Sequence, residues 1–267
     1  MESKLTVSFI EFLNAIPLGW GFLYGTDKDK FKVLFDVPSE CARHLARSEA
    51  DVGLIPVIEY QRIPGLQVIP DISISSRRKV RSVLFASRKP IDRIETVALD
   101  CSSRTSVVLL KILMAEFYGQ KSILYAERRP EPSSMLNECD AALLIGHNAI
   151  KASLNGLWVY DLAEEWHRFT GLPFVFAFWA VREGVDMSAW KDIFVRSRDE
   201  GLKSLLEISK MYASELSLSP EEIHSYLYHN LHYSMNENNL AGLNHFYELA
   251  YKIGVIEKPH PLQFLQD

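Results

Sequence analysis

Short apolar runs alternate with segments of helical periodicity through the first two thirds of the chain. Runs with strand composition occupy residues 5–10, 31–37, 50–57, 96–100 and 141–146, and most lead into a helical pattern. A helix is predicted over 105–118, because Val107, Leu110, Met114 and Phe117 recur at intervals of three and four before Gly119. This alternation favours an α/β fold with mostly parallel sheets and helices on their faces.

The segment "LPFVFAFWAV" (172–181) is apolar on both faces, which is typical of a central strand covered by helices. From residue 186 onward the pattern is helical, and "SPEE" (219–222) forms a capping box. Upstream, Ser39 is expected to cap a helix that runs to about residue 47. A 267-residue chain with this organisation predicts two α/β lobes, with a helical tail that returns to the first lobe. Ligands of such folds bind at the carboxyl ends of the strands.

Charge and cysteine usage exclude several functional classes. The formal net charge is −5, so no global basic field would attract nucleic acid, and we interpret the basic run at 77–81 as a solvated loop. The opening residues lack the pattern of a signal peptide, and the longest apolar run covers about half a membrane span. Three cysteines without a CxxC spacing indicate reduced thiols, so we expect a cytoplasmic protein without a membrane segment.

The stretch "DCSSRTSVV" (100–108) places four hydroxyl side chains where a strand meets a helix. Helix N-termini carry unpaired N–H groups and the positive end of the helix dipole, and both stabilise anions. Because a simple cap would need one hydroxyl, the pattern favours an anion site built from neutral donors. The alternative is one capping residue among ordinary loop residues. Neither GxxxxGK[ST] nor GxGxxG occurs, so a nucleotide site is not indicated.

Three further segments end strands with polar side chains that could contact a ligand. Asn14 precedes a helix entered at Pro17, although an asparagine that only stabilises its own turn is an equal alternative. Ser82 is a polar position on an otherwise apolar strand face, where a bond to the backbone is the simpler interpretation. Gly146 and His147 end the run at 141–146. The tail histidines lack further ligands at helical spacing, so no metal site is predicted, and the aromatic runs "FVFAFWA" and "YLYHNLHY" are expected to pack in the core.

Six segments, in this order and spacing, resemble the menaquinone biosynthetic enzyme family, and most narrowly its chorismate dehydratases of the futalosine pathway. They are "SFIEFLNAIPLGWG", "CARHLARSEADVGLIPVIEY", "VRSVLFAS", "LDCSSRTSVVLLKILMAEFYG", "DAALLIGHNA" and "TGLPFVFAFWAVR". The resemblance implies a two-lobed fold of the type II periplasmic-binding-protein kind with the site in its cleft. It further implies a first lobe from residues 1–84 and 181–267, the second part mainly helical, and a second lobe from residues 85–180.

The resemblance also implies conversion of chorismate to 3-(1-carboxyvinyloxy)benzoate and water, without a metal or a cofactor. Catalytic contacts with the reacting ring are expected from Asn14 and Ser82. Substrate-binding contacts, chiefly to a carboxylate, are expected from Ser103, Arg104, Thr105, Ser106, Gly146 and His147. The group that removes the ring proton is not assigned.

Two alternatives stay open. One is 1,4-dihydroxy-6-naphthoate synthase of the same pathway, which opens on a Ser-Pro-Cys-Pro-Asn-Asp type segment and relies on a histidine late in its second lobe. The other is a non-catalytic cytosolic module that binds a carboxylate. No oligomeric state is predicted.

Overall fold

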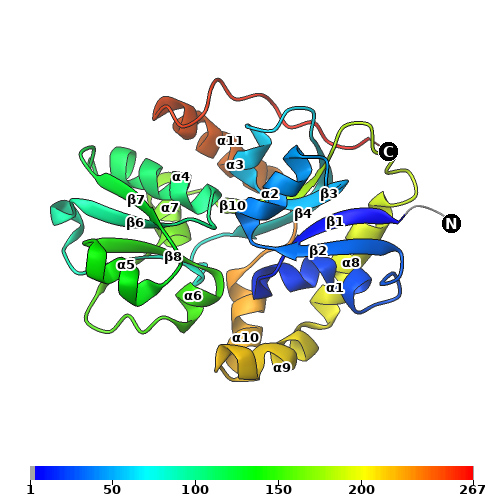
Figure 1. Cartoon of the computed structure of the whole chain (residues 1–267), viewed down its shortest axis with the longest axis horizontal. Coiled ribbons are helices and arrows are strands. Elements are labelled where there is room, and N and C mark those ends of the chain that lie inside the picture. The colour runs from blue at the N-terminus through cyan, green and yellow to red at the C-terminus, as the bar shows by residue number, and fades with distance from the viewer. Residues whose placement is uncertain (1–3, 267) are drawn as a thin grey trace.

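The strands of the chain form two five-stranded sheets, one in each lobe of the molecule (Figure 1). The computed structural model describes residues 4–266. The first sheet has the order β2-β1-β3-β10-β4, with β1 (Leu5–Ile10), β2 (Phe31–Asp36), β3 (Val52–Pro56), β4 (Gln67–Ser76) and β10 (Phe174–Val181). The second sheet has the order β7-β6-β8-β5-β9, with β5 (Val83–Ser87), β6 (Thr96–Asp100), β7 (Leu124–Arg128), β8 (Ala141–Ile145) and β9 (Trp158–Asp161).

Helices cover both sheets, as the alternating pattern predicts. The first lobe carries α1 (Ile16–Leu23), α2 (Pro38–Ala46), α3 (Val57–Tyr60) and, from the C-terminal part of the chain, α8 (Lys191–Lys203). The second lobe carries α4 (Thr105–Ile112), α5 (Pro132–Glu138), α6 (Gly146–Lys151) and α7 (Leu162–Thr170). The chain ends with α9 (Leu205–Leu216), α10 (Pro220–Ser225) and α11 (Glu237–Lys252). Short 3-10 turns span Leu13–Ala15 and Ile91–Arg93, and single π-turns follow α4 and α10 over Leu113–Phe117 and Tyr226–Asn230.

The sheets are mixed rather than mostly parallel. In each sheet four strands run in one direction, while β10 in the first and β5 in the second run opposite and pair antiparallel with both neighbours. The reason is that the chain enters the second sheet through β5 and returns to the first through β10. The two lobes are thus joined by two connections, 77–82 between β4 and β5 and 171–173 between α7 and β10.

The expected boundary at residue 180 is wrong for β10, because Phe174–Val181 pairs with β3 and β4 of the first sheet. All eight residues of β10 are buried, as expected for a central strand. Ser39 also differs from expectation: α2 begins at Pro38 with Val37 at its N-cap and no capping side chain. The edge strand β7 and helix α5 have no counterpart among the predicted elements, because β7 lacks a clear alternation of buried and exposed positions.

The helical tail packs against both lobes. Helix α8 lies along α1, α9 contacts α6, and α11 contacts β10 and α4. In Figure 1, α9 and α10 lie at one end of the boundary between the lobes and α11 lies at the other. The tail therefore stabilises one arrangement of the two lobes. Within residues 4–266, no helix combines the length and the apolar character needed to cross a bilayer.

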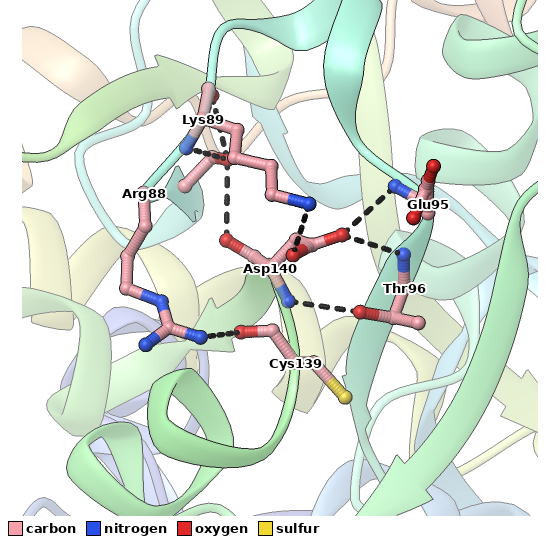
Figure 2. A network of polar contacts seen from close by, with 7 residues as sticks. Arg88, Lys89, Glu95, Thr96, Cys139 and Asp140 are labelled. Carbon is pink, nitrogen blue, oxygen red and sulfur yellow. Dashed lines mark hydrogen bonds and ion pairs between the residues drawn. The ribbon is translucent and has the colours of Figure 1, made fainter.

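A polar network around Asp140 joins the ends of β5, β6 and β8 (Figure 2). The Asp140 carboxylate accepts hydrogen bonds from the backbone N–H groups of Glu95 and Thr96, at 3.0 and 3.1 Å, and pairs with Lys89 Nζ at 2.8 Å. Partial burial would raise the pKa of Asp140, but the Lys89 ammonium and the two N–H groups outweigh it and lower this pKa to about 2.

We expect Asp140→Ala to lower the free energy of unfolding by about 1–3 kcal/mol, because two backbone N–H groups at the start of β6 lose their acceptor. Lys89→Ala, which removes only a partly exposed ion pair, should cost about 1 kcal/mol or less. Urea unfolding of the two variants measures the difference in the free energy of unfolding. An equal loss of stability in both would contradict the prediction that the two backbone N–H bonds contribute more than the ion pair. The folded pKa is depressed, so the stabilisation is fully present above the unfolded value of about 4. It is lost as the pH falls through about 2.

Candidate active site

A cleft of about 530 Å³, including its open mouth, lies where the two lobes meet. Both sheets contribute residues at or next to strand ends, as expected for this class of fold. Its apolar walls are Ile10, Phe12, Pro38, Pro56, Ile74, Val80, Val83, Ile145, Phe176 and Ala177. Its other lining residues are Asn14, Ser82, Ser103, Arg104, Thr105, Ser106 and Gly146. Seven of the eight residues singled out from the sequence thus come together, although they belong to four separate segments.

The start of α4 contributes hydroxyl groups in three different environments. Ser102 is outside the cleft lining, and both its N–H and its hydroxyl donate to the Asp100 carboxylate, which shapes the loop. Burial raises the pKa of Asp100, while the bonds from Ser102 oppose that effect. Thr105 Oγ1 accepts a hydrogen bond from the Ile58 N–H of the first lobe at 3.4 Å, so its own proton can still be donated into the cleft.

Ser103 and Ser106 line the cleft, and within residues 4–266 neither hydroxyl has a hydrogen-bond partner. Arg104 is the N-cap of α4. Among the described residues that line the cleft, it is the one with a charged side chain. The helix start therefore presents free hydroxyls, unpaired N–H groups and one guanidinium to the same space, which is the chemistry that binds a carboxylate.

Asn14 lies in the 3-10 turn that leads into α1, where Pro17 at the second helical position directs the chain. Its Oδ1 atom is buried and has no hydrogen-bond partner among the described residues. An amide oxygen left unpaired in a buried site costs free energy, so it indicates a place where a ligand donates. The amide group can also donate through its nitrogen.

Ser82 is oriented by Tyr226, a residue that the sequence analysis assigned to core packing. The Tyr226 phenol donates to Ser82 Oγ at 2.8 Å, and burial raises the pKa of this phenol, so it stays protonated. Since Ser82 Oγ accepts from Tyr226, its own hydroxyl proton is available to the cleft. The Ser82 carbonyl also accepts the Gly146 N–H at 2.9 Å, which joins the two cleft segments.

Gly146 has a positive φ of 57°, and a Cβ atom there would lie 2.9 Å from the Phe12 ring. A glycine is therefore required for the Phe12 side chain of the first lobe to close against the second lobe. Phe12 and Phe176 form part of the cleft wall, although the sequence analysis did not select them. No periodicity separates an aromatic that faces a cleft from one that fills a core, so the sequence carries no signal for them.

His147 differs from the expectation, because it lies outside the cleft lining. Its Nε2 accepts a hydrogen bond from the Leu13 N–H at 3.0 Å, next to Asn14, and its Nδ1 lies 3.4 Å from Glu215 Oε1. Burial lowers the pKa of His147, partly opposed by Glu215, so the neutral form with its proton on Nδ1 satisfies both contacts. Its side chain is thus engaged in holding the Asn14 segment against the second lobe.

The cleft can hold an anion and donate hydrogen bonds, but it offers no side-chain base. No aspartate, glutamate or histidine occurs among the described residues that line it. The described part of the chain also contains no group of three His, Cys, Asp or Glu side chains placed to bind a metal ion. Such a set of fixed, mostly neutral donors is suited to stabilising negative charge.

Comparisons with known proteins agree with this architecture. Solved structures with the same fold include AF1704 of Archaeoglobus fulgidus, at a TM-score of 0.78 and 20% identity, covering 96% of this chain and all of that one. The periplasmic aliphatic sulphonate binding protein SsuA of Escherichia coli matches at a TM-score of 0.68 and 16% identity, covering all of this chain and 95% of its own. The chain thus has a periplasmic-binding-protein-like fold, as expected.

Sequence comparison is more specific than the fold. A chorismate dehydratase of Thermus thermophilus is 32% identical over 237 residues, which cover 82% of this chain and 86% of the relative. A family model described as menaquinone biosynthesis matches residues 5–252, and so takes in both lobes, the cleft and most of the helical tail. With the predicted cleft segments assembled in one place and nearly the whole chain matched, this protein belongs to the menaquinone biosynthesis family.

Proposed function

We propose that this protein is a chorismate dehydratase, a hydro-lyase that forms 3-(1-carboxyvinyloxy)benzoate and water. The observation that carries the proposal is the cleft itself, in which hydroxyl, amide and guanidinium donors face apolar walls without a base or a metal-binding group. The 32% identity with the Thermus thermophilus chorismate dehydratase supports the same substrate. The test is to incubate the protein with chorismate and follow the absorbance of the aromatic product.

The reaction suits such a cleft. Chorismate carries one carboxylate on its ring and one on its enolpyruvyl ether, and dehydration removes the proton at C3 and the hydroxyl at C4. Negative charge then develops toward the ring carboxylate before hydroxide leaves and the ring becomes aromatic. Fixed donors aimed at that carboxylate lower the barrier, because they need no reorganisation while the charge develops. Apolar walls hold the ring in one orientation and strengthen these interactions.

The geometry supports a division of roles between the two lobes. Ser103, Thr105 and Ser106, with the start of α4 and the Arg104 guanidinium, bind a carboxylate. Asn14 and Ser82 face the remaining space and contact the reacting part of the ring. Gly146 contributes the shape of the wall and His147 positions the Asn14 segment. For the C3 proton, the remaining acceptors are the substrate's own enolpyruvyl carboxylate and a cleft water.

The two alternatives make different predictions in the same assay. A carboxylate-binding module would return chorismate unchanged, whereas a naphthoate synthase would act on the cyclic futalosine intermediate instead. The absence of a histidine from the described cleft lining disfavours the synthase, which relies on one. We also infer a cytoplasmic protein that acts on a small molecule and not on nucleic acid, in keeping with its three free cysteines and net charge of −5.

Asn14→Ala should lower kcat/KM for chorismate by about 100-fold or more, the typical effect of removing one donor from a stabilising site. Steady-state product absorbance measures it. Asn155→Ala, an exposed asparagine of the second lobe, is the matched control and should retain full activity. Near-wild-type turnover in both Asn14→Ala and Ser82→Ala would contradict this site assignment.

Ser82→Ala should lower both activity and stability, because it removes a cleft donor and leaves the buried Tyr226 hydroxyl without an acceptor, at about 1–3 kcal/mol. Adding Tyr226→Phe to Ser82→Ala should recover much of the stability but not the activity. Thermal unfolding and kcat/KM of the two single variants and the double variant separate these effects. If the double variant regained wild-type activity, Ser82 would be a structural residue only.

Activity should fall as the pH drops below the pKa of His147, which burial places under the usual 6.5. Protonated Nε2 is a donor and cannot accept from the Leu13 N–H, so the Asn14 segment loosens and KM for chorismate rises. The pKa of His147 is lower in the folded protein than in the unfolded chain. The stabilisation by the Leu13–His147 hydrogen bond is therefore complete above the unfolded pKa and is lost as the pH falls through the folded pKa.

In the variant His147→Ala we expect KM to rise about 5- to 10-fold, with a smaller change in kcat and without this low-pH rise. His147→Gln, whose side-chain oxygen can accept the same N–H, should restore most of the affinity. KM against pH for the three proteins is the measurement. A low-pH rise of KM that persists in His147→Ala would assign the titration to another group.

A further inference from the structure

A second polar site lies outside the cleft, at the place where the chain passes between the lobes. Two adjoining hollows share Arg77, His167 and His232 in their linings. One of them also contains Arg78, Lys79, Tyr228, His229 and Asn230. The other also contains Gly171, Pro173, Ser234, Asn236, Asn238 and Asn239. These residues come from both connections between the lobes, from α7, from the segment that follows α10 and from the start of α11.

The charges at these hollows are unbalanced. Arg77, Arg78 and Lys79 are fixed cations, and no aspartate or glutamate lines either hollow in the part of the chain that the structure describes. None of the three cations forms an ion pair within residues 4–266. Three adjacent cations without a carboxylate partner create a local positive potential, even though the net charge of the chain is −5.

Hydrogen bonds to the backbone hold the cluster in place. The backbone of His232 exchanges two hydrogen bonds with Ser75 at the end of β4, at 2.8 and 2.9 Å. The Asn230 amide donates to the Lys79 carbonyl at 2.9 Å, and the Asp161 carboxylate accepts the N–H groups of Val80 and Arg81. The loop that carries the three cations is therefore anchored at its base, while their charges stay free.

Two observations concern the histidines that line these hollows. The Nδ1 atom of His167 is buried and has no hydrogen-bond partner among the described residues. Burial lowers the pKa of His232, and the positive field of the neighbouring Arg77 lowers it further. A bound anion would give His167 a partner and would neutralise that field.

We propose that these hollows bind the phosphate monoester of a small hydroxylated molecule. Two arginine forks and a lysine suit a dianion with three oxygens better than a single carboxylate. Next to the shared residues, the second hollow offers only neutral hydrogen-bonding groups, Ser234, Asn236, Asn238 and Asn239, which suit hydroxyl groups. Because the ligand would contact both connections between the lobes, its binding would also favour one lobe arrangement.

Ribose 5-phosphate is the probe, measured by isothermal titration calorimetry and by its effect on Tm. We expect saturable binding and a rise in Tm, both absent with ribose or with sodium chloride at equal ionic strength. Arg77→Ala/Arg78→Ala should weaken binding about tenfold or more, because two charge-assisted contacts are lost. Lys121→Ala/Lys258→Ala removes the same charge from exposed sites elsewhere and should leave binding unchanged.

The outcomes are distinct. Equal binding of inorganic phosphate and ribose 5-phosphate would support an oxyanion site and overturn the contribution of the neutral hollow. An equal effect of sodium chloride, or an unchanged affinity in Arg77→Ala/Arg78→Ala, would overturn the site itself. The Tm of the same double variant without ligand serves as the folding control, so the result does not depend on the proposed dehydratase activity.

Discussion

The placement of the two lobes depends on the hydrogen bonds that the Asp161 carboxylate accepts. It accepts the N–H groups of Val80 and Arg81 in one connection between the lobes, and those of Ala163 and Glu164 at the start of α7. Burial raises the pKa of Asp161, and the four backbone donors oppose this effect and keep the carboxylate satisfied. One side chain thus fixes both the left-handed backbone at Arg81 and the start of α7. Ser82, the next residue along the chain, takes its position in the cleft from this anchor.

Across the cleft, the lobes are joined mainly by neutral hydrogen bonds. Ser39 donates to the Ser102 carbonyl, Ile58 donates to Thr105 Oγ1, and Leu13 donates to His147 Nε2. Such bonds contribute modestly in free energy and can exchange with water when the lobes separate. None of these bonds uses a hydroxyl proton of Ser82, Ser103 or Ser106, so those donors stay available in the cleft. The segments that join the lobes across the cleft are therefore also the segments that carry its hydrogen-bond donors.

Much of the candidate site could be predicted from the sequence, because four hydroxyl groups at one strand-to-helix junction exceed what a helix cap requires. Asn14, Ser82, Ser103, Arg104, Thr105, Ser106 and Gly146 all line the cleft. Tyr226 could not be found in this way, because its role depends on contact with Ser82, 144 positions earlier in the chain. His147 follows the last cleft residue of its strand, but the direction of its side chain depends on Leu13 in the other lobe.

By itself, the sequence determined the α/β class, the strands and helices that carry the site, and the dense set of hydrogen-bond donors at 103–106. Periodicity, glycine stops and local donor density are properties of neighbouring residues. Only the tertiary structure decided that β10 returns antiparallel to the first sheet and that Phe12 and Phe176 face a cleft instead of a core. It also decided that three cations lie near partly buried histidines beside the connections between the lobes. Those outcomes depend on contacts between segments far apart in the chain, and no local pattern encodes which of the possible partners a side chain will meet.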